Sequence, residues 1–298
     1  MKVFVTGATG FIGSAVVQEL LSAGHQVLGL ARSDAAAASL TAAGATPHRG
    51  SIDDLASLQS GAAASDGVIH LAFIHDFTNL VESCEKDRRA IEALGEVLAG
   101  TGKPFVVTVG TMGLEQGRLV TEEDLTDPNG GGIARIESER TTLALASKGV
   151  RSSIVRLPPS VHGEGDHGFA PVLINIARAK GVSAYIGDGS NRWPTVHRLD
   201  AARVFRLALE SAPAGSKLHA VAEEAIPFRD IATVVGRHLN VPVVSKSKDE
   251  AADHFSWLAF VIPKDNPTSS ALTREQFGWS PVQLGLLQDL DQEYYYKS

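Results

Sequence analysis

Three glycines near the amino terminus have the type and spacing that dinucleotide binding requires. Gly7, Gly10 and Gly13 lie three residues apart and follow the apolar, strand-like segment Lys2–Thr6. In a βαβ unit such glycines make a tight turn, let the backbone approach a pyrophosphate and let a helix pack closely on its strand. The N–H groups and positive dipole end of the next helix, predicted at Phe11–Ser22, then face the phosphates. The sequence therefore predicts a dinucleotide site here.

The end of the second predicted strand decides which dinucleotide binds. NAD-binding versions place Asp or Glu about 20 residues after the first glycine, where it accepts a hydrogen bond from the ribose 2′-hydroxyl. Here that stretch reads Leu30-Ala31-Arg32-Ser33. Ala31 has no side-chain acceptor, whereas Arg32 and Ser33 can hold a 2′-phosphate. We therefore expect NADP(H); the alternatives are that Arg32 is a solvated surface residue and that Asp34 serves NAD.

Further cofactor contacts follow from the order of the strands. Gly50–Asp53 follows the third predicted strand and is expected beside the adenine ring. The small and apolar residues after strand four suit a backbone that passes beneath the adenosine and pyrophosphate. The contacts predicted around these strands are Gly7, Thr9, Gly10, Phe11, Ile12, Gly13, Arg32, Ser33, Ser51, Ile52, Leu71, Ala72 and Phe73.

The elements that position these residues alternate between strand and helix in the first half of the chain, as in a parallel sheet. After Pro158-Pro159 the pattern becomes irregular, with a loop rich in Gly, His and Asp at 162–168. We predict an α/β protein with a doubly wound parallel sheet and a smaller C-terminal lobe. Residues 1–158 would form the NADP-binding domain, and residues 159–298 mainly the substrate-binding lobe, with about 195–222 returning to the first domain.

Composition bounds the partners and the compartment. The 298 residues carry a net charge of −7, which argues against nucleic acid or anionic membranes because phosphate binding needs clustered Lys and Arg. Cys84 is the only cysteine, so a reducing compartment fits. A predicted strand follows Met1 almost directly, so we expect no signal peptide. Apolar runs such as 68–74 are too short to cross a bilayer. We therefore expect a soluble, cytoplasmic protein.

Four blocks resemble the short-chain dehydrogenase/reductase superfamily, most closely its extended, epimerase/dehydratase-like branch. They are Thr6–Gly13, His70–Phe73, Arg156–Gly163 and Val196–Asp200, and they span residues 1 to about 210 in the family's order. The resemblance implies a Rossmann core and a small C-terminal substrate lobe. It also implies that the backbone after strand six meets the nicotinamide carboxamide, which adds Pro158, Ser160 and Val161 to the predicted cofactor contacts.

The chain departs from this family at the reaction centre. Members use a Tyr-x-x-x-Lys pair on the helix before strand six, in which Lys holds the ribose and lowers the pKa of the Tyr that protonates the carbonyl. Here the Lys position falls at or near Arg135 and the Tyr position at or near Gly131. All four tyrosines, at 185 and 294–296, lie elsewhere. The chain is therefore identified as an atypical member that lacks this pair.

Other residues can replace the missing pair. Thr111 matches the family's Ser/Thr position after strand five and can donate to a substrate oxygen, with Thr108 as second choice. Arg135 stays charged, so it can stabilise an alkoxide or bind ribose but is a poor proton source. His75, just past strand four, and His162, at the family's Tyr-Gly turn, can supply a proton. We predict Thr111, Arg135 and His75 as catalytic; a local hydrogen-bonding role is the alternative for each.

The remaining candidates favour structural roles. Asp200 is predicted to open helix 201–209 as its N-cap, and Cys84 to lie in or near the core. Trp193 and Phe169 either line the substrate cleft or pack between the lobes. The ten histidines form no H-x-x-x-H or HExxH pair, so we predict no metal site.

Three functions follow from these patterns. The leading prediction is an NADPH-dependent reductase of a ketone or aldehyde group in a small molecule, with Arg135 and Thr111 polarising the oxygen. The missing Tyr motivates a second prediction, a non-catalytic NADP(H)-binding redox sensor. A third, a nucleotide-sugar epimerase or dehydratase, rests on the resemblance alone. The resemblance also allows a homodimer through helices 82–101 and 135–149.

Overall fold

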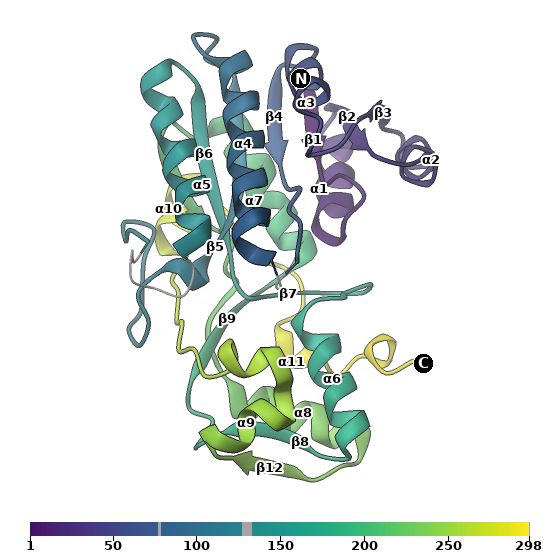
Figure 1. The fold of residues 1–298 in the computed structure, drawn as a ribbon, viewed down its shortest axis with the longest axis vertical. Helices are drawn as coiled ribbons and strands as arrows, with labels where there is room; N and C mark the ends of the chain where they lie inside the picture. Colours follow the sequence, from purple (N-terminus) through teal and green to yellow (C-terminus); the bar gives the residue numbers. More distant parts are fainter. Residues whose placement is uncertain (77–78, 127–132, 298) are drawn as a thin grey trace.

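A seven-stranded parallel sheet forms the centre of the computed structural model, which describes residues 1–76, 79–126 and 133–297 (Figure 1). Its strand order is β10-β6-β5-β4-β1-β2-β3, and every neighbouring pair is parallel. The chain direction across the sheet reverses between β1 and β4, which opens a crevice at their carboxyl ends, where ligands bind in such sheets. The predicted doubly wound fold is confirmed. The strands are β1 (Lys2–Thr6), β2 (Gln26–Ala31), β3 (Thr46–Arg49), β4 (Gly67–His70), β5 (Pro104–Gly110), β6 (Arg151–Leu157) and β10 (Ser216–His219).

Helices cover both faces of this sheet, so its central strands are apolar on both sides. In β1, successive side chains point to opposite faces: Val3 and Val5 enter one core, Phe4 enters the other, and all three are fully buried. The helices of the first face are α1 (Phe11–Ser22), α2 (Asp34–Ala42) and α7 (Arg198–Ser211). Those of the second face are α3 (Leu55–Ala63), α4 (Leu80–Leu98) and α5 (Ile133–Ala144).

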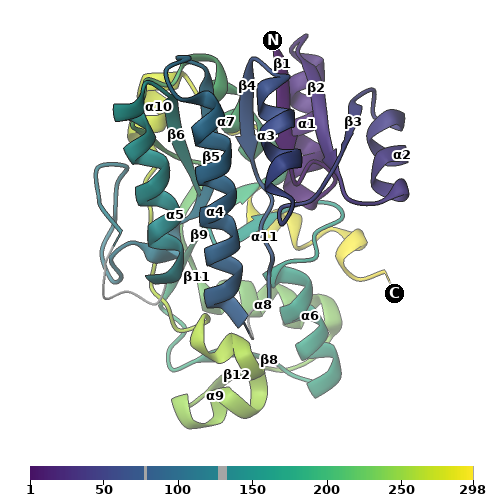
Figure 2. The same ribbon diagram turned by 45° about the horizontal axis from the view of Figure 1, so that its top comes forward.

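A second lobe lies beyond the carboxyl edge of the sheet, as Figure 2 also shows. Its core contains an aromatic cluster: the Trp193 ring lies 5.6 Å from that of Phe169 and 5.0 Å from that of Phe228, and only 1% of Trp193 is exposed. Trp193 therefore packs rather than lining a cleft. The lobe's strands are β7 (Ser160–His162), β8 (Ser183–Ile186), β9 (Arg192–His197), β11 (Glu223–Pro227) and β12 (Val243–Lys246). Its helices are α6 (Phe169–Lys180), α8 (Phe228–Leu239), α9 (Lys248–Phe255) and α11 (Leu286–Asp289), whereas α10 (Ala271–Phe277) lies beside β10.

The chain crosses between the two halves more than once. After β9 it returns to the sheet through α7 and the edge strand β10. An ion pair between Arg206 of α7 and Glu19 of α1, at 2.7 Å, fastens these helices to each other. In the part of the chain that the structure describes, no helix is both long and apolar enough to span a bilayer.

The structure does not place Asp200 at the helix N-cap that the sequence predicted. Helix α7 begins at Arg198, and His197 is its N-cap, accepting a hydrogen bond from the Leu199 N–H through Nδ1 at 3.3 Å. Asp200 therefore lies inside the first turn, and its predicted N-cap role is wrong because the helix starts earlier than the pattern indicated. Its buried carboxylate instead accepts the backbone N–H groups of Val282 and Gln283 at 2.9–3.1 Å. Asp200 thus holds the C-terminal segment against α7.

Replacing Asp200 by Ala should lower the free energy of unfolding by about 2 kcal/mol, because two backbone donors lose a charged acceptor. Asp249→Ala is the matched control, since Asp249 also lies in the first turn of a helix but is exposed. Urea denaturation of both variants measures the difference. Equal small losses would show that the carboxylate of Asp200 does not secure the segment at 282–283.

Candidate active site at the carboxyl edge of the sheet

The turn between β1 and α1 leaves backbone groups open toward the crevice. Gly7 has φ +66°, and a Cβ there would lie 2.8 Å from the Ala72 nitrogen. A Cβ on Gly13 would lie 1.9 Å from the Gly7 oxygen, so packing alone requires both glycines. Gly10 is the exposed N-cap residue of α1, and no side-chain hydrogen bond from this position caps the first N–H groups of the helix. The first N–H groups of α1 are therefore available to phosphate oxygens, and the turn fits a dinucleotide.

Two guanidinium groups gather where β2 and β3 end. Arg32 is exposed, and Arg49 lies level with Ala31 in the ladder. Arg49 pairs with Asp34 at 2.9 Å, so this carboxylate already has a cationic partner. Ser33 is the N-cap of α2: its Oγ accepts the Ala36 N–H at 3.2 Å and keeps its own proton for another acceptor. This corner of the crevice is rich in donors.

The exit of β4 is held against the glycine turn by Thr6. Its Oγ1 accepts the N–H groups of Leu71 and Ala72, each at 3.2 Å. Leu71, Ala72 and Phe73 are all half-buried there. The predicted adenine-side residues Ser51 and Ile52 are half-buried just after β3.

A buried polar network runs from Thr6 into the helices behind the sheet. The Thr6 Oγ1 lies 2.8 Å from His70 Nδ1, and His70 Nε2 lies 3.2 Å from Asp87 Oδ1. Because Thr6 Oγ1 already accepts two N–H groups, its own proton goes to His70 Nδ1, and His70 Nε2 donates to Asp87. The Ser138 hydroxyl donates to the other Asp87 oxygen at 2.6 Å. Burial raises the pKa of Asp87, but the hydrogen bond from His70 and the charge of Arg135 outweigh it and hold the pKa below its usual value.

Arg135 lies where this network reaches the crevice. Its Nη2 donates to the Thr108 carbonyl at 2.9 Å and lies 3.6 Å from Asp87, and its guanidinium lies 3.9 Å from the centre of the Phe73 ring. About a quarter of the side chain, 27%, is exposed. Arg135 Nε and the Thr108 hydroxyl are buried polar atoms with no hydrogen-bond partner among the described residues. Each of the two atoms therefore has a hydrogen-bonding capacity that no described residue uses.

His75 also contacts the Phe73 ring. The two ring centres are 5.1 Å apart and the rings are nearly perpendicular, so Phe73 contacts both Arg135 and His75. Burial, followed by the charges of Arg135 and His167, lowers the pKa of His75 below its usual value. At neutral pH His75 is therefore an uncharged imidazole, which can donate a hydrogen bond but is a weak source of protons.

The chain is similar to known proteins over most of its length. The model of the NAD dependent epimerase/dehydratase family matches residues 3–221. The chain belongs to this family. An uncharacterized protein of Schizosaccharomyces pombe is 53% identical over 298 residues, which cover 99% of this chain and all of that protein. A 2-alkyl-3-oxoalkanoate reductase of Stenotrophomonas maltophilia is 27% identical over 270 residues, 83% of this chain and 78% of the reductase.

Solved structures agree with this assignment at the level of the fold. The crystal structure of a dTDP-glucose 4,6-dehydratase of Streptomyces venezuelae, determined with NAD bound, matches with a TM-score of 0.80 at 20% identity. The match covers 99% of this chain and 97% of the dehydratase. The predicted relationship to the extended short-chain dehydrogenases is thus confirmed, and the family and its structural neighbours bind NAD(P).

Not every residue predicted from the family's pattern faces the crevice. Thr111 is fully buried; its hydroxyl donates to Asn266 Oδ1 at 2.7 Å, and Asn266 Nδ2 donates back to the Thr111 carbonyl at 3.2 Å. The structure therefore gives Thr111 a structural role in place of the predicted catalytic one. His162 is also buried and lies 2.8 Å from Asp289 of the second lobe. The predicted Tyr position at Gly131 lies outside the described residues.

The predicted nicotinamide contacts lie at the junction of the lobes. Pro158 and Ser160 are buried and Val161 is half-buried, with Ser160 and Val161 in β7. Phe11 and Ile12 are half-buried at the start of α1, and Thr9 is exposed in the turn before it. Among the described residues, no group of three or more His, Cys, Asp or Glu side chains is arranged to hold a metal ion.

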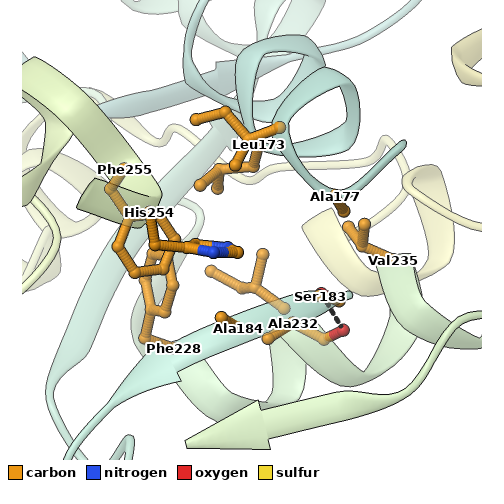
Figure 3. A pocket seen from close by; sticks show the side chains of 11 residues that line it. Leu173, Ala177, Ser183, Ala184, Phe228, Ala232, Val235, His254 and Phe255 are labelled. Atoms are coloured by element: carbon orange, nitrogen blue, oxygen red, sulfur yellow. Dashed lines mark hydrogen bonds between the residues drawn. The ribbon is translucent and has the colours of Figure 1, made fainter. Parts of the chain in front are cut away.

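A cavity inside the second lobe is a separate feature (Figure 3). It lies among α6, β8, α8 and α9, and its volume of about 10 Å³ holds no more than a single water molecule. His254 and Ser183 are its polar neighbours, and the Ser183 hydroxyl already donates to the Ala232 carbonyl at 2.7 Å. The cavity is a packing gap and is too small for a substrate.

Asp87 is a site residue that the sequence did not reveal. It lies in α4 between Lys86 and Arg88, in a polar stretch that resembles a solvated helix face. Only its burial and its contacts with His70 and Arg135 distinguish it. No local motif could have found it.

Asp87→Asn should destabilise the protein by about 3 kcal/mol at pH 7, because Arg135 and His70 lose a buried charged partner. The pKa of Asp87 is depressed, so its stabilisation is complete above the unfolded value of about 3.9 and is lost as pH falls through the folded value. The difference from wild type, measured by urea denaturation, should therefore shrink on acidification. Glu85→Gln, on the exposed face of the same helix, should leave stability almost unchanged. A difference for Asp87→Asn that is independent of pH would contradict this account.

Proposed function

We propose that this protein is an NADPH-dependent oxidoreductase that reduces a ketone or aldehyde group of a small organic molecule. The observation that supports this most directly is Arg135, a permanent cation beside Phe73 at the crevice next to the glycine turn. Membership of the family and the name of the 2-alkyl-3-oxoalkanoate reductase relative support the reaction class.

Different residues around the crevice would bind different parts of the cofactor. The first N–H groups of α1 would bind the pyrophosphate, Ser51 and Ile52 would lie beside the adenine, and the backbone at 158–161 would meet the carboxamide. The donors Arg32, Ser33 and Arg49 would hold the 2′-phosphate, which favours NADPH over NADH. When bound, NADPH supplies the hydride.

Arg135 would act on the carbonyl oxygen of the substrate. Its fixed charge stabilises the negative charge that develops on oxygen as the carbonyl carbon is reduced. It cannot release a proton at working pH. The Thr108 hydroxyl, which has no partner among the described residues, and the neutral His75 would add hydrogen bonds to the same oxygen. Thr111 has no part in this proposal, since Asn266 accepts its proton.

The test is oxidation of NADPH, followed by loss of the reduced nicotinamide absorbance, with a panel of ketones and aldehydes. NADH is run in parallel, and binding of both cofactors is titrated on the same protein. Turnover that prefers NADPH is expected. Tight binding without any turnover would contradict the proposal and favour the redox sensor.

Arg135→Ala should lower kcat/KM by about a hundredfold, because a charged donor to the developing oxyanion is lost. Arg140→Ala is the control, since Arg140 lies on the same helix but is exposed and pairs with Glu137 at 3.0 Å. Steady-state kinetics of both variants at saturating NADPH make the comparison. An Arg135→Ala enzyme as active as Arg140→Ala would remove Arg135 from the reaction.

Arg32→Ala should weaken NADPH binding by about ten- to a hundredfold, the loss of one or two charge-assisted hydrogen bonds. Binding of NADH, which has no 2′-phosphate, should change little. Isothermal titration calorimetry measures both, with Arg237→Ala on the exposed face of α8 as the control. Equal weakening of the two cofactors would argue against a 2′-phosphate contact.

A further inference from the structure

The loop between β7 and α6 places a carboxyl group beside a tyrosine from the C-terminal segment. Asp166 is half-buried; its Oδ1 accepts the Gly168 N–H at 2.6 Å, and its Oδ2 lies 3.3 Å from the Tyr295 hydroxyl. Tyr295 is buried, and its hydroxyl accepts the Gly163 N–H at 3.0 Å. Residues 129 apart in the chain therefore meet at this loop.

The Tyr295 hydroxyl faces two carboxyl groups but has only one proton to donate. The Tyr295 hydroxyl also lies 3.2 Å from Asp289 Oδ2, and its single proton cannot serve two carboxylates at once. Asp289 additionally accepts hydrogen bonds from His162 and Tyr294, which outweigh burial and hold the pKa of Asp289 below its usual value. Asp289 is therefore ionised and takes the Tyr295 proton. Asp166 then faces a phenol oxygen without a hydrogen, an arrangement that a proton on Asp166 satisfies.

The surroundings of Asp166 agree with this count. Burial raises the pKa of Asp166 to about 6, although the hydrogen bonds that Gly168 and a reoriented Tyr295 hydroxyl give to the ionised form oppose the rise. The carboxyl can therefore both hold and release a proton near neutrality, as Arg135 cannot. The titratable or charged groups around it on the loop itself and on β7, β9, α7, α11 and the C-terminal segment are His162, Glu164, His167, His197, Arg198, Asp289, Tyr294 and Tyr295.

The loop lies beside the crevice. The His167 ring, next in sequence, is 5.7 Å from the ring of Phe11 at the start of α1. The Arg198 guanidinium lies 5.1 Å from the same Phe11 ring, and His167 contributes to the lowered pKa of His75. In Figure 1, β7 lies between the sheet and the second lobe. The Asp166 loop thus approaches the glycine turn from the lobe.

We propose that Asp166 is the proton donor of the reduction, replacing the phenol that the family's helix supplies, and that Tyr295 is its positioning residue. This inference rests on the proposed function. As hydride adds to the carbonyl carbon, the C=O π bond breaks and the oxygen takes the Asp166 proton, forming an alcohol O–H bond. Asp166 is left as a carboxylate, toward which the Tyr295 hydroxyl can turn, and it regains a proton from water. Each alcohol consumes one hydride and one proton.

The first test needs neither cofactor nor substrate. Infrared difference spectra of the free protein between pH 4 and 8 should show a protonated carboxyl band that titrates at about pH 6. The band should be lost in Asp166→Asn and kept in Asp188→Asn. Asp188 is a matched control: it also accepts the N–H two residues on, from Ser190 at 3.0 Å, but it is exposed in another glycine-flanked turn. The absence of such a band, or its survival in Asp166→Asn, would overturn the assignment.

Tyr295→Phe tests the positioning role. The ionised form of Asp166 loses a hydrogen-bond donor, so the midpoint of the infrared titration should move to higher pH. Thermal unfolding of the variant shows that the chain remains folded. An unchanged midpoint would remove Tyr295 from the assignment.

Kinetics then separate this inference from the proposed function. In the wild type, kcat should fall as pH rises through about 6, because the donor ionises. Asp166→Asn should lower kcat by about a hundredfold and abolish this pH dependence, with NADPH affinity unchanged. Turnover that survives in Asp166→Asn with the same pH profile would overturn the role of Asp166 and leave the reductase standing. A titrating Asp166 in a protein that reduces no carbonyl compound would instead overturn the proposed function, and the donor role with it.

Discussion

The close approach of the glycine turn to the exit of β4 fixes the rest of the site. Gly7 lies against the backbone of Ala72 with no room for a Cβ. The Thr6 hydroxyl accepts hydrogen bonds from the N–H groups of Leu71 and Ala72, which directly follow β4. The same Thr6 hydroxyl orients His70, His70 donates to Asp87, and Asp87 pairs with Arg135. One continuous chain of contacts therefore links the glycine turn to Arg135, and it sets the positions of the two groups to which we assign phosphate binding and charge stabilisation.

In the proposed mechanism, the stabilising charge and the transferred proton come from different residues. In the Tyr-x-x-x-Lys arrangement of the family, one helix supplies both functions four residues apart. Here we assign the charge to Arg135 of α5, whereas the titratable groups His75 and Asp166 come from the β4–α4 and β7–α6 loops. Because a guanidinium stays charged over the working pH range, the positive charge of Arg135 is constant while the loop groups titrate.

Sequence patterns predicted the fold and the cofactor crevice because the signals for both are local. Strands and helices alternate along the first half, and the three glycines lie within one turn, so neither required knowledge of distant partners. Asp200 was misplaced because the helix begins at Arg198 and polar residues mask its start. The contacts of Thr111 depend on Asn266, 155 residues away, and those of Asp166 on Tyr295; no periodicity or spacing predicts such pairs.

The path of the chain has a consequence for biosynthesis. The edge strand β10 is complete only once residue 219 has been synthesised. Asn266, whose side chain forms hydrogen bonds with Thr111 directly after β5, is synthesised later still. A nascent chain that stops before these residues leaves the edge of β6 and the buried Thr111 open to water. The nucleotide-binding half is therefore not a detachable module, and it completes its own sheet only when segments beyond the second lobe's first strands have left the ribosome.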